Sequence, residues 1–154
     1  MNKRVLVVSS ANLDFVQRMR RLPNAGETVI ESASYGYVPG GKGANSAVAF
    51  ARMGNDCVFC TRLGADNNGN RLRAVYDKEG IDTRFIARDR TAPTGLASIL
   101  VEEDGANRII VYPGANEKLN PSDIEEAFTC YPDAVYLQFE IPDKAVFAAA
   151  RFAA

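Results

Sequence analysis

Gly40-Gly41-Lys42-Gly43-Ala44-Asn45 forms a glycine-rich turn that leads into a helix. Two glycines without a Cβ let the backbone lie close to a ligand. Lys42 adds a positive charge, and the free N–H groups of the following helix would point at the same place. This spacing matches neither the dinucleotide fingerprint G-x-G-x-x-G nor the P-loop G-x-x-x-x-G-K-[ST]. We therefore expect a site for a small hydroxyl-rich or anionic molecule. An ordinary turn before a helix is the alternative.

Around this turn, buried strands alternate with amphipathic helices. Such alternation is typical of right-handed βαβ crossovers and predicts an α/β fold with a parallel sheet. Gly54 and Gly80 mark the ends of the first two helices, and Asn120-Pro121 has the form of a helix start. The predicted strands are Val5–Val8, Cys57–Leu63, Ile81–Ile86 and Ala134–Gln138, and the predicted helices are Gly43–Met53, a segment ending near Glu79, one from Pro121 and one from Pro142.

Three segments interrupt this alternation. Thr28–Ser34 alternates loosely as a strand, and Thr94–Val101 with Arg108–Tyr112 flank an Asp-Gly turn that predicts a hairpin. We expect these segments, near 28–34 and 94–112, to form a small separate β layer that could act as a lid over the parallel sheet.

Composition excludes several classes of function. The 154 residues are 47% hydrophobic with a net charge of −1, which gives no footprint for nucleic acid or an anionic membrane. No apolar run approaches a membrane span or a signal peptide, so we expect a cytoplasmic protein. Histidine is absent, which excludes a Ser-His-Asp triad. The three cysteines are expected in the core, with Cys57 and Cys60 on opposite faces of one strand; no metal site is expected.

Polar side chains should meet at one edge of the parallel sheet. Asn12 and Asp14 follow the first strand, the turn at 40–45 opens a helix, and Gln138 and Glu140 end the strand Ala134–Gln138. Ligands of open parallel sheets bind beyond the carboxyl ends of the strands. Carboxylates and amides beside a backbone cradle can grip several sugar hydroxyls. Taken singly, each of these residues could instead be a turn, cap or solvated strand-end residue.

With these motifs the chain resembles the ribokinase-like (PfkB) family of carbohydrate kinases, and within it the ribokinase branch most closely. The resemblance runs in order over nearly all 154 residues. It is carried by Ser10-Ala11-Asn12-Leu13-Asp14, Pro23–Val29, Gly40–Asn45, Gly64-Ala65-Asp66 with Gly69, Thr94-Gly95, Pro113-Gly114-Ala115-Asn116 and Gln138–Pro142.

The resemblance implies a ribokinase-like three-layer fold in which the β layer is the lid, closing over the sugar and pairing with a second subunit as a homodimer. It also implies which residues contact a small-molecule sugar. These are Asn12, Asp14, Gly40, Gly41, Lys42, Asn45 and Glu140, with Ala97 and Ile99 as candidate contacts from the lid. For the last two, ordinary strand packing is an equal alternative.

The resemblance also defines what this chain lacks. Family members are about twice as long, and their second half carries a Gly-Ala-Gly-Asp motif with the catalytic base, the adenine pocket and an Asn-x-x-x-Glu motif tied to Mg²⁺. None of these occurs here, and an apolar helical stripe (Val146, Phe147, Ala150, Ala154) runs to the last residue. We therefore expect residues 1–154 to be the N-terminal substrate-binding part of one domain, truncated before the nucleotide-binding half.

The expected function follows from the whole family pattern. The full-length parent would be an ATP-dependent carbohydrate kinase that phosphorylates the primary hydroxyl of a pentose, ribose first, with ATP, Mg²⁺ and a monovalent cation. This chain would contribute no catalytic residue and would be inactive alone. Deoxyribose, fructose phosphate or a nucleoside are alternative substrates. A non-catalytic sugar-binding or dimerisation module is the alternative function.

Overall fold

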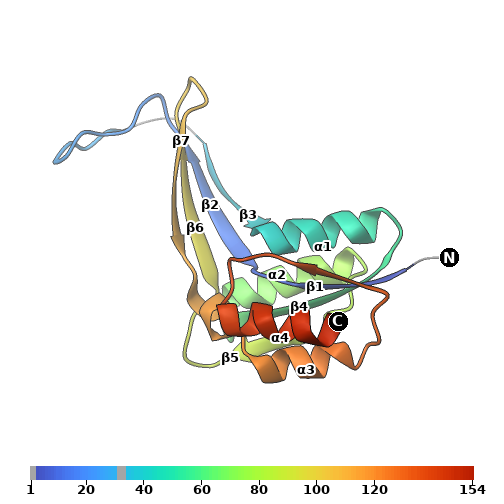
Figure 1. Cartoon of the computed structure of the whole chain (residues 1–154). Helices are drawn as coiled ribbons and strands as arrows, with labels where there is room; N and C mark the ends of the chain where they lie inside the picture. The colour runs from blue at the N-terminus through green and yellow to red at the C-terminus, as the bar shows by residue number, and fades with distance from the viewer. Residues whose placement is uncertain (1–2, 31–33) are drawn as a thin grey trace.

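A parallel sheet of four strands forms the centre of the protein (Figure 1). The computed structural model describes residues 3–30 and 34–154. The strand order is β5-β4-β1-β8, and each neighbouring pair runs parallel. The strands are β1 (Arg4–Val8), β4 (Asp56–Gly64), β5 (Ile86–Asp89) and β8 (Ala134–Leu137). The predicted α/β fold with a parallel sheet is confirmed.

Helices cover both faces of this sheet. On one face α1 (Lys42–Arg52) and α2 (Asn67–Lys78) pack through Ala47 and Leu72, and on the other α3 (Pro121–Phe128) and α4 (Asp143–Ala153) pack through side chains such as Ile124. Cys57 belongs to the first core and Cys60 to the second, as strand alternation predicted. Both are free and buried, like Cys130. The protein therefore has three layers.

A second, small sheet projects from the three layers (Figure 1). Its order is β3-β2-β6-β7, with β2 parallel to β6 and the outer pairs antiparallel. The strands are β2 (Asn12–Arg18), β3 (Tyr35–Gly40), β6 (Gly95–Val101) and β7 (Asn107–Tyr112). We call these four strands the small sheet. The predicted hairpin is confirmed as β6 and β7.

The predicted strand at 28–34 is wrong. Residues 28–30 are not in a strand, and residues 31–33 lie outside the described residues. The strand lies further on, at Tyr35–Gly40, and it runs directly into α1. Its partner β2 was not predicted at all, because only Ser9–Ala11 separate it from β1 and they carry no turn signal.

Other boundaries differ more modestly from the expectations. Asp66 caps α2 by accepting from Gly69 N, so that helix begins before Gly69. In the segment Ile81–Ile86 only Asp82 bridges to β4, and the next strand begins at Ile86. The expected start of α3 is confirmed, with Asn120 in a reciprocal capping box. No helix of the described residues is long and apolar enough to cross a membrane.

The stripe expected on the last helix is partly wrong. The side of α4 that packs on the sheet carries Ala145, Val146, Ala148 and Ala149, whereas Phe147 and Ala150 are exposed. Strand β8 is also less buried than predicted, because it is an edge strand in this chain.

Candidate functional site

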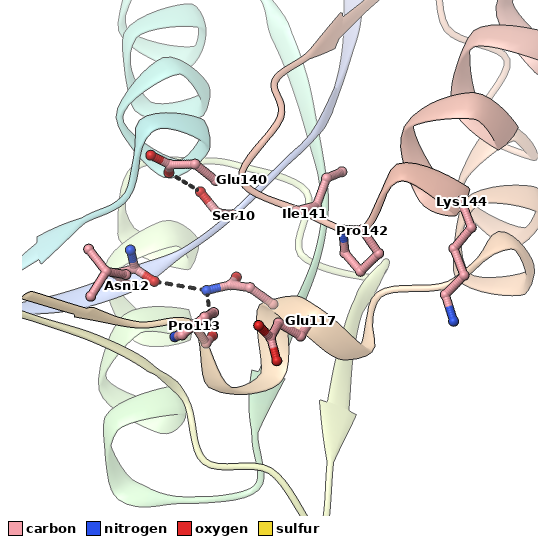
Figure 2. Close-up of a pocket in the computed structure, with 10 residues that line it drawn as sticks. Ser10, Asn12, Pro113, Glu117, Glu140, Ile141, Pro142 and Lys144 are labelled. Atoms are coloured by element: carbon pink, nitrogen blue, oxygen red, sulfur yellow. Dashed lines mark hydrogen bonds between the residues drawn. The ribbon is translucent and has the colours of Figure 1, made fainter.

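A cavity of about 700 Å³ lies where the two sheets meet (Figure 2). Figure 2 shows Ser10 and Glu140 on one side of it and Asn12 and Pro113 on the other, with Lys144 at one end. These residues come from segments that end or begin at the carboxyl edge of the central sheet: the turn after β1, the segment after β7 and the segment after β8. Its lining residues are Ser10, Asn12, Val111, Pro113, Asn116, Glu117, Glu140, Ile141, Pro142 and Lys144.

The glycine-rich turn lies directly on the start of β2. Gly41 has a φ of 90°, a left-handed conformation that favours glycine. A Cβ at this position would lie 2.9 Å from Asn12 N and 3.1 Å from Ala11 Cα. Ala44 N donates to Ser10 O (3.1 Å), which fixes the first turn of α1 against the same segment. No side chain caps this helix, so its leading N–H groups remain at the turn.

Asp14 is the most unusual group of the site. It shares a face of the small sheet with Asn12, because it lies two residues further along β2. Asp14 pairs with Ala97 of the neighbouring strand β6. Ala97 in turn pairs with Val111 of β7, which lines the cavity. Its Oδ1 is buried and has no hydrogen-bond partner within residues 3–30 and 34–154. Burial, and then the charge of Glu140, raise the pKa of Asp14 above its ordinary value.

Glu140 is held by residues from two other segments and by Gln138 of its own segment. Lys42 Nζ lies 2.5 Å from its Oε1, and Ser10 Oγ donates to its Oε2 over 2.9 Å. Its backbone N–H donates to Gln138 Oε1 over 2.7 Å. Burial raises the pKa of Glu140, but the hydrogen bonds from Lys42 and Ser10 outweigh it, so the pKa lies below its ordinary value. Glu140 is therefore an ionised carboxylate with a fixed position.

The structure thus brings together most residues that the sequence selected. Asn12, Asp14, Gly40, Gly41, Lys42 and Glu140 lie around one junction. Asn45 lies one turn along α1, exposed, where it lines a neighbouring hollow with Pro39 and Val48. Ala97 is buried on the face of Asp14, and Ile99 follows on the same face nearer the tip of the sheet.

Sequence reasoning missed one buried residue of the cavity. Asn116 lies in the short 3₁₀ helix η1 (Gly114–Lys118) and donates through Nδ2 to Asn12 Oδ1 over 2.8 Å. The sequence identified it only as the last residue of the motif Pro113-Gly114-Ala115-Asn116. A short polar side chain after Pro-Gly is typical of a turn residue, and no sequence signal indicated that the side chain of Asn116 would be buried.

The arrangement combines hydrogen-bond donors and acceptors within one site. It offers carboxylate oxygens as acceptors, an amide and an ammonium group as donors, and apolar strand residues on one wall. Each hydroxyl of a polyol can donate to a carboxylate and accept from an amide at the same time. With histidine absent, no side chain with an ordinary pKa near 7 is available as a general base.

Comparison with known proteins places these features in a family. The family model described as pfkB family carbohydrate kinase matches residues 2–154. The ribokinase of Staphylococcus aureus (strain COL) is 36% identical over 152 residues, which are 97% of this chain and 50% of that protein. The crystal structure of ribokinase from Thermotoga maritima has a TM-score of 0.86 at 36% identity, covering 97% of this chain and 49% of that one.

A further solved structure was determined with ligands. The structure of Arabidopsis thaliana ribokinase complexed with ribose and ATP has a TM-score of 0.84 at 34% identity, covering 99% of this chain and 50% of that chain. The chain therefore spans about half the length of the relatives that it matches.

Proposed function

Because the chain belongs to the pfkB family of carbohydrate kinases, we propose that it forms the substrate-binding part of an ATP-dependent pentose kinase. The kinase would transfer the γ-phosphate of ATP to the primary hydroxyl of the sugar, and D-ribose is the first substrate to test. Residues 1–154 would be the N-terminal part of one ribokinase-like domain. The similarity to ribokinases, one of them solved with ribose and ATP, supports this choice.

One observation carries the proposal: the buried Oδ1 of Asp14 has no hydrogen-bond partner among the described residues, and Asp14 lies two residues along β2 from Asn12, which lines the cavity. A buried carboxylate oxygen that accepts nothing costs free energy, so it is retained where a ligand satisfies it. A sugar hydroxyl is a suitable ligand because it is neutral and donates. Each hydrogen bond to a charged group is worth about 1.5–3 kcal/mol, so two of them would supply about 3–6 of the roughly 8 kcal/mol of a micromolar affinity.

The remaining residues would complete the grip. Lys42 and Glu140 form an ion pair that presents a donor and an acceptor at the cavity edge. Gly40 and Gly41 would let the sugar approach the backbone, and Ala97 and Ile99 would cover its apolar face from the small sheet, acting as the lid. That Asn45 contacts the sugar stays a prediction; its backbone N–H donates to Gly41 O over 3.0 Å and so steadies the turn.

The residues of this chain do not by themselves fit ATP. Among the residues that line the cavity, the acidic residues Glu117 and Glu140 outnumber Lys144, the one basic residue, so the lining would repel phosphates on balance. Lys42, the cation of the turn, is already paired with Glu140. We therefore propose that ATP, Mg²⁺, a monovalent cation and the catalytic base are held by residues outside this chain. The task of this chain is to bind and orient the sugar and to exclude water from it.

The test uses the protein as its gene encodes it. Ribose, deoxyribose, fructose 6-phosphate and a nucleoside are each incubated with ATP and Mg²⁺, and ³¹P NMR locates the phosphoryl group on the product. Phosphorylation of the ribose primary hydroxyl, lost in Asp14→Asn, is the expected result. Ribose binding by calorimetry without ATP turnover would instead identify a non-catalytic sugar-binding module. Absence of both binding and turnover with every sugar would overturn the proposal.

We also propose that the protein forms a homodimer through the small sheet. This sheet exposes apolar side chains on both of its faces, more than monomeric proteins usually expose. Tyr35, Tyr37, Ile110 and Tyr112 lie on one face, and Val38, Ile109 and Val111 lie on the face of Asp14. Ile110, 69% exposed, lies within this group. Ile110→Glu should convert a dimer to a monomer in analytical ultracentrifugation, whereas Phe147→Glu on α4 should not. A wild-type protein that sediments as a monomer at micromolar concentration would exclude this interface.

The proposed compartment is the cytoplasm. Cys57, Cys60 and Cys130 are free and buried, which suits a reducing environment.

A further inference from the structure

The side chain of Asn116 lies at the junction of the two sheets and is only 2% exposed. Its Oδ1 accepts from Ala11 N over 2.9 Å. Its Nδ2 donates to Asn12 Oδ1 (2.8 Å), Pro113 O (2.9 Å) and Ala11 O (3.2 Å). Ala11 and Asn12 open β2 and Pro113 follows β7, so one amide group joins two strands of the small sheet to η1.

The contact between the two amides leaves little free space. A Cβ built at Gly95, the first residue of β6, would overlap both Asn12 Oδ1 and Asn116 Nδ2 and would lie 3.0 Å from Pro113 O. The Asn12 amide is therefore held between Asn116 and the backbone of Gly95. Asn12 itself is 6% exposed and reaches the cavity (Figure 2).

This arrangement fixes which end of the Asn12 amide is available to a ligand. Its oxygen is occupied by the N–H of Asn116. The two N–H groups are then the part that remains for the cavity. Two residues further along the same face, Asp14 offers only oxygen atoms. A donor and an acceptor therefore stand side by side along β2, in the pattern that a pair of neighbouring hydroxyls requires.

We propose that Asn116 is a positioning residue, which orients the Asn12 amide with its nitrogen toward the sugar and thereby sets the donor–acceptor order of the site. Asn116 acts through Asn12 and does not need to touch the sugar itself. The inference deepens the proposed function and rests on it for the identity of the ligand. The orientation of the Asn12 amide is inferred from the hydrogen bonds of the ligand-free protein alone.

A double-mutant cycle tests this role. Ribose dissociation constants are measured by calorimetry for wild type, Asn12→Ala, Asn116→Ala and the double variant, in the protein as its gene encodes it. Residues that act as one unit show non-additive effects. We expect Asn116→Ala to weaken ribose binding roughly tenfold when Asn12 is present and less than about twofold when Asn12 is absent. Equal factors in both backgrounds would overturn the proposal.

A matched control separates positioning from general destabilisation. Asn120→Ala removes the capping box of α3 and should lower the thermal midpoint comparably. Asn120 lies four residues after Asn116, but its side chain bonds Lys118, Ser122 and Asp123 and not the junction. It should leave the ribose dissociation constant within about twofold of wild type. Loss of ribose binding in Asn120→Ala as large as in Asn116→Ala would mean that stability, and not orientation, controls binding.

A ligand-free measurement keeps the inference testable if ribose is not the ligand. The side-chain ¹⁵N–¹H₂ signals of Asn12 report whether its amide is fixed, and hydrogen exchange at Ala11 N reports its bond to Asn116. Asn116→Ala should lower the order parameter of the Asn12 side-chain amide, move its ¹⁵N and ¹H shifts toward those of a free amide, and accelerate Ala11 exchange at least about tenfold. Failure of wild type to bind any sugar would contradict the proposed function alone. Unchanged Asn12 signals in Asn116→Ala would contradict the positioning role.

Discussion

Gly40 packs against the Asp14 carboxylate, and adding one methyl group there should separate sugar binding from folding. A Cβ at Gly40 would lie 2.6 Å from Asp14 Oδ1, with Cγ and Oδ2 closer still, whereas real side chains approach no nearer than 3.0 Å. The carboxylate must therefore move in Gly40→Ala. A misplacement of about 1 Å can cost on the order of 100-fold, and the loss of two charge-assisted hydrogen bonds gives a similar figure. We expect a ribose dissociation constant raised about 100-fold.

Gly36→Ala is the matched control, because Gly36 lies in the same strand and a Cβ there meets nothing within 4 Å. Alanine restricts the unfolded chain, so this control should be unchanged or stabilised by about 0.4–1 kcal/mol. Overpacking should destabilise Gly40→Ala by about 1–3 kcal/mol, since a single short side chain can rotate away. Calorimetric titration with ribose and urea unfolding of both variants make the comparison. Ribose affinities that agree within about threefold would refute a role of the Asp14 carboxylate in binding.

Three further perturbations test the site and the fold. Because burial raises the pKa of Asp14, the folded protein takes up this proton at a higher pH than the unfolded chain. The contribution of Asp14 to the free energy of unfolding should therefore rise as the pH falls through its raised pKa. Ribose binding should weaken over the same pH range, and Asp14→Asn should abolish both trends in a pH series. Lys42→Met removes a cation that is 72% exposed, so it should leave the urea unfolding midpoint almost unchanged yet weaken ribose binding about tenfold in calorimetry. Arg62→Met removes the guanidinium group that pairs with both Asp89 (3.1 Å) and Asp123 (2.8 Å). It should lower the free energy of unfolding in urea by about 3–5 kcal/mol, and a loss below about 1 kcal/mol would contradict this expectation.

The central sheet could be predicted because its strands carry strong local signals. Val5–Val8 and Cys57–Cys60 are continuous apolar runs, and the structure places them in β1 and β4, side by side and buried on both faces. Gly54 and Gly80 both adopt positive φ after the helices that they were predicted to end. In such segments local propensity and tertiary packing favour the same structure.

The small sheet was harder to predict because its strands pack on one another and only their bases pack on the core. In β2, Val16 and Gln17 break the apolar alternation, and β3 is largely exposed, so neither has the pattern of a half-buried strand. The role of Asn116 could not be predicted for a related reason. Its partners Ala11 and Asn12 lie more than 100 positions away in the sequence. Only the tertiary fold brings them together.

No strand of one sheet pairs with a strand of the other within residues 3–30 and 34–154, so the two sheets are joined by the connecting chain and by packing at the base of the small sheet. The connections cross at Asn12, Gly40, Gly95 and Pro113. Insertions and substitutions in the outer part of the small sheet can therefore accumulate while the register of the central sheet stays the same. Replacing residues 13–39 and 96–112 together by those of a relative should therefore transfer that relative's sugar preference and oligomeric state to this protein.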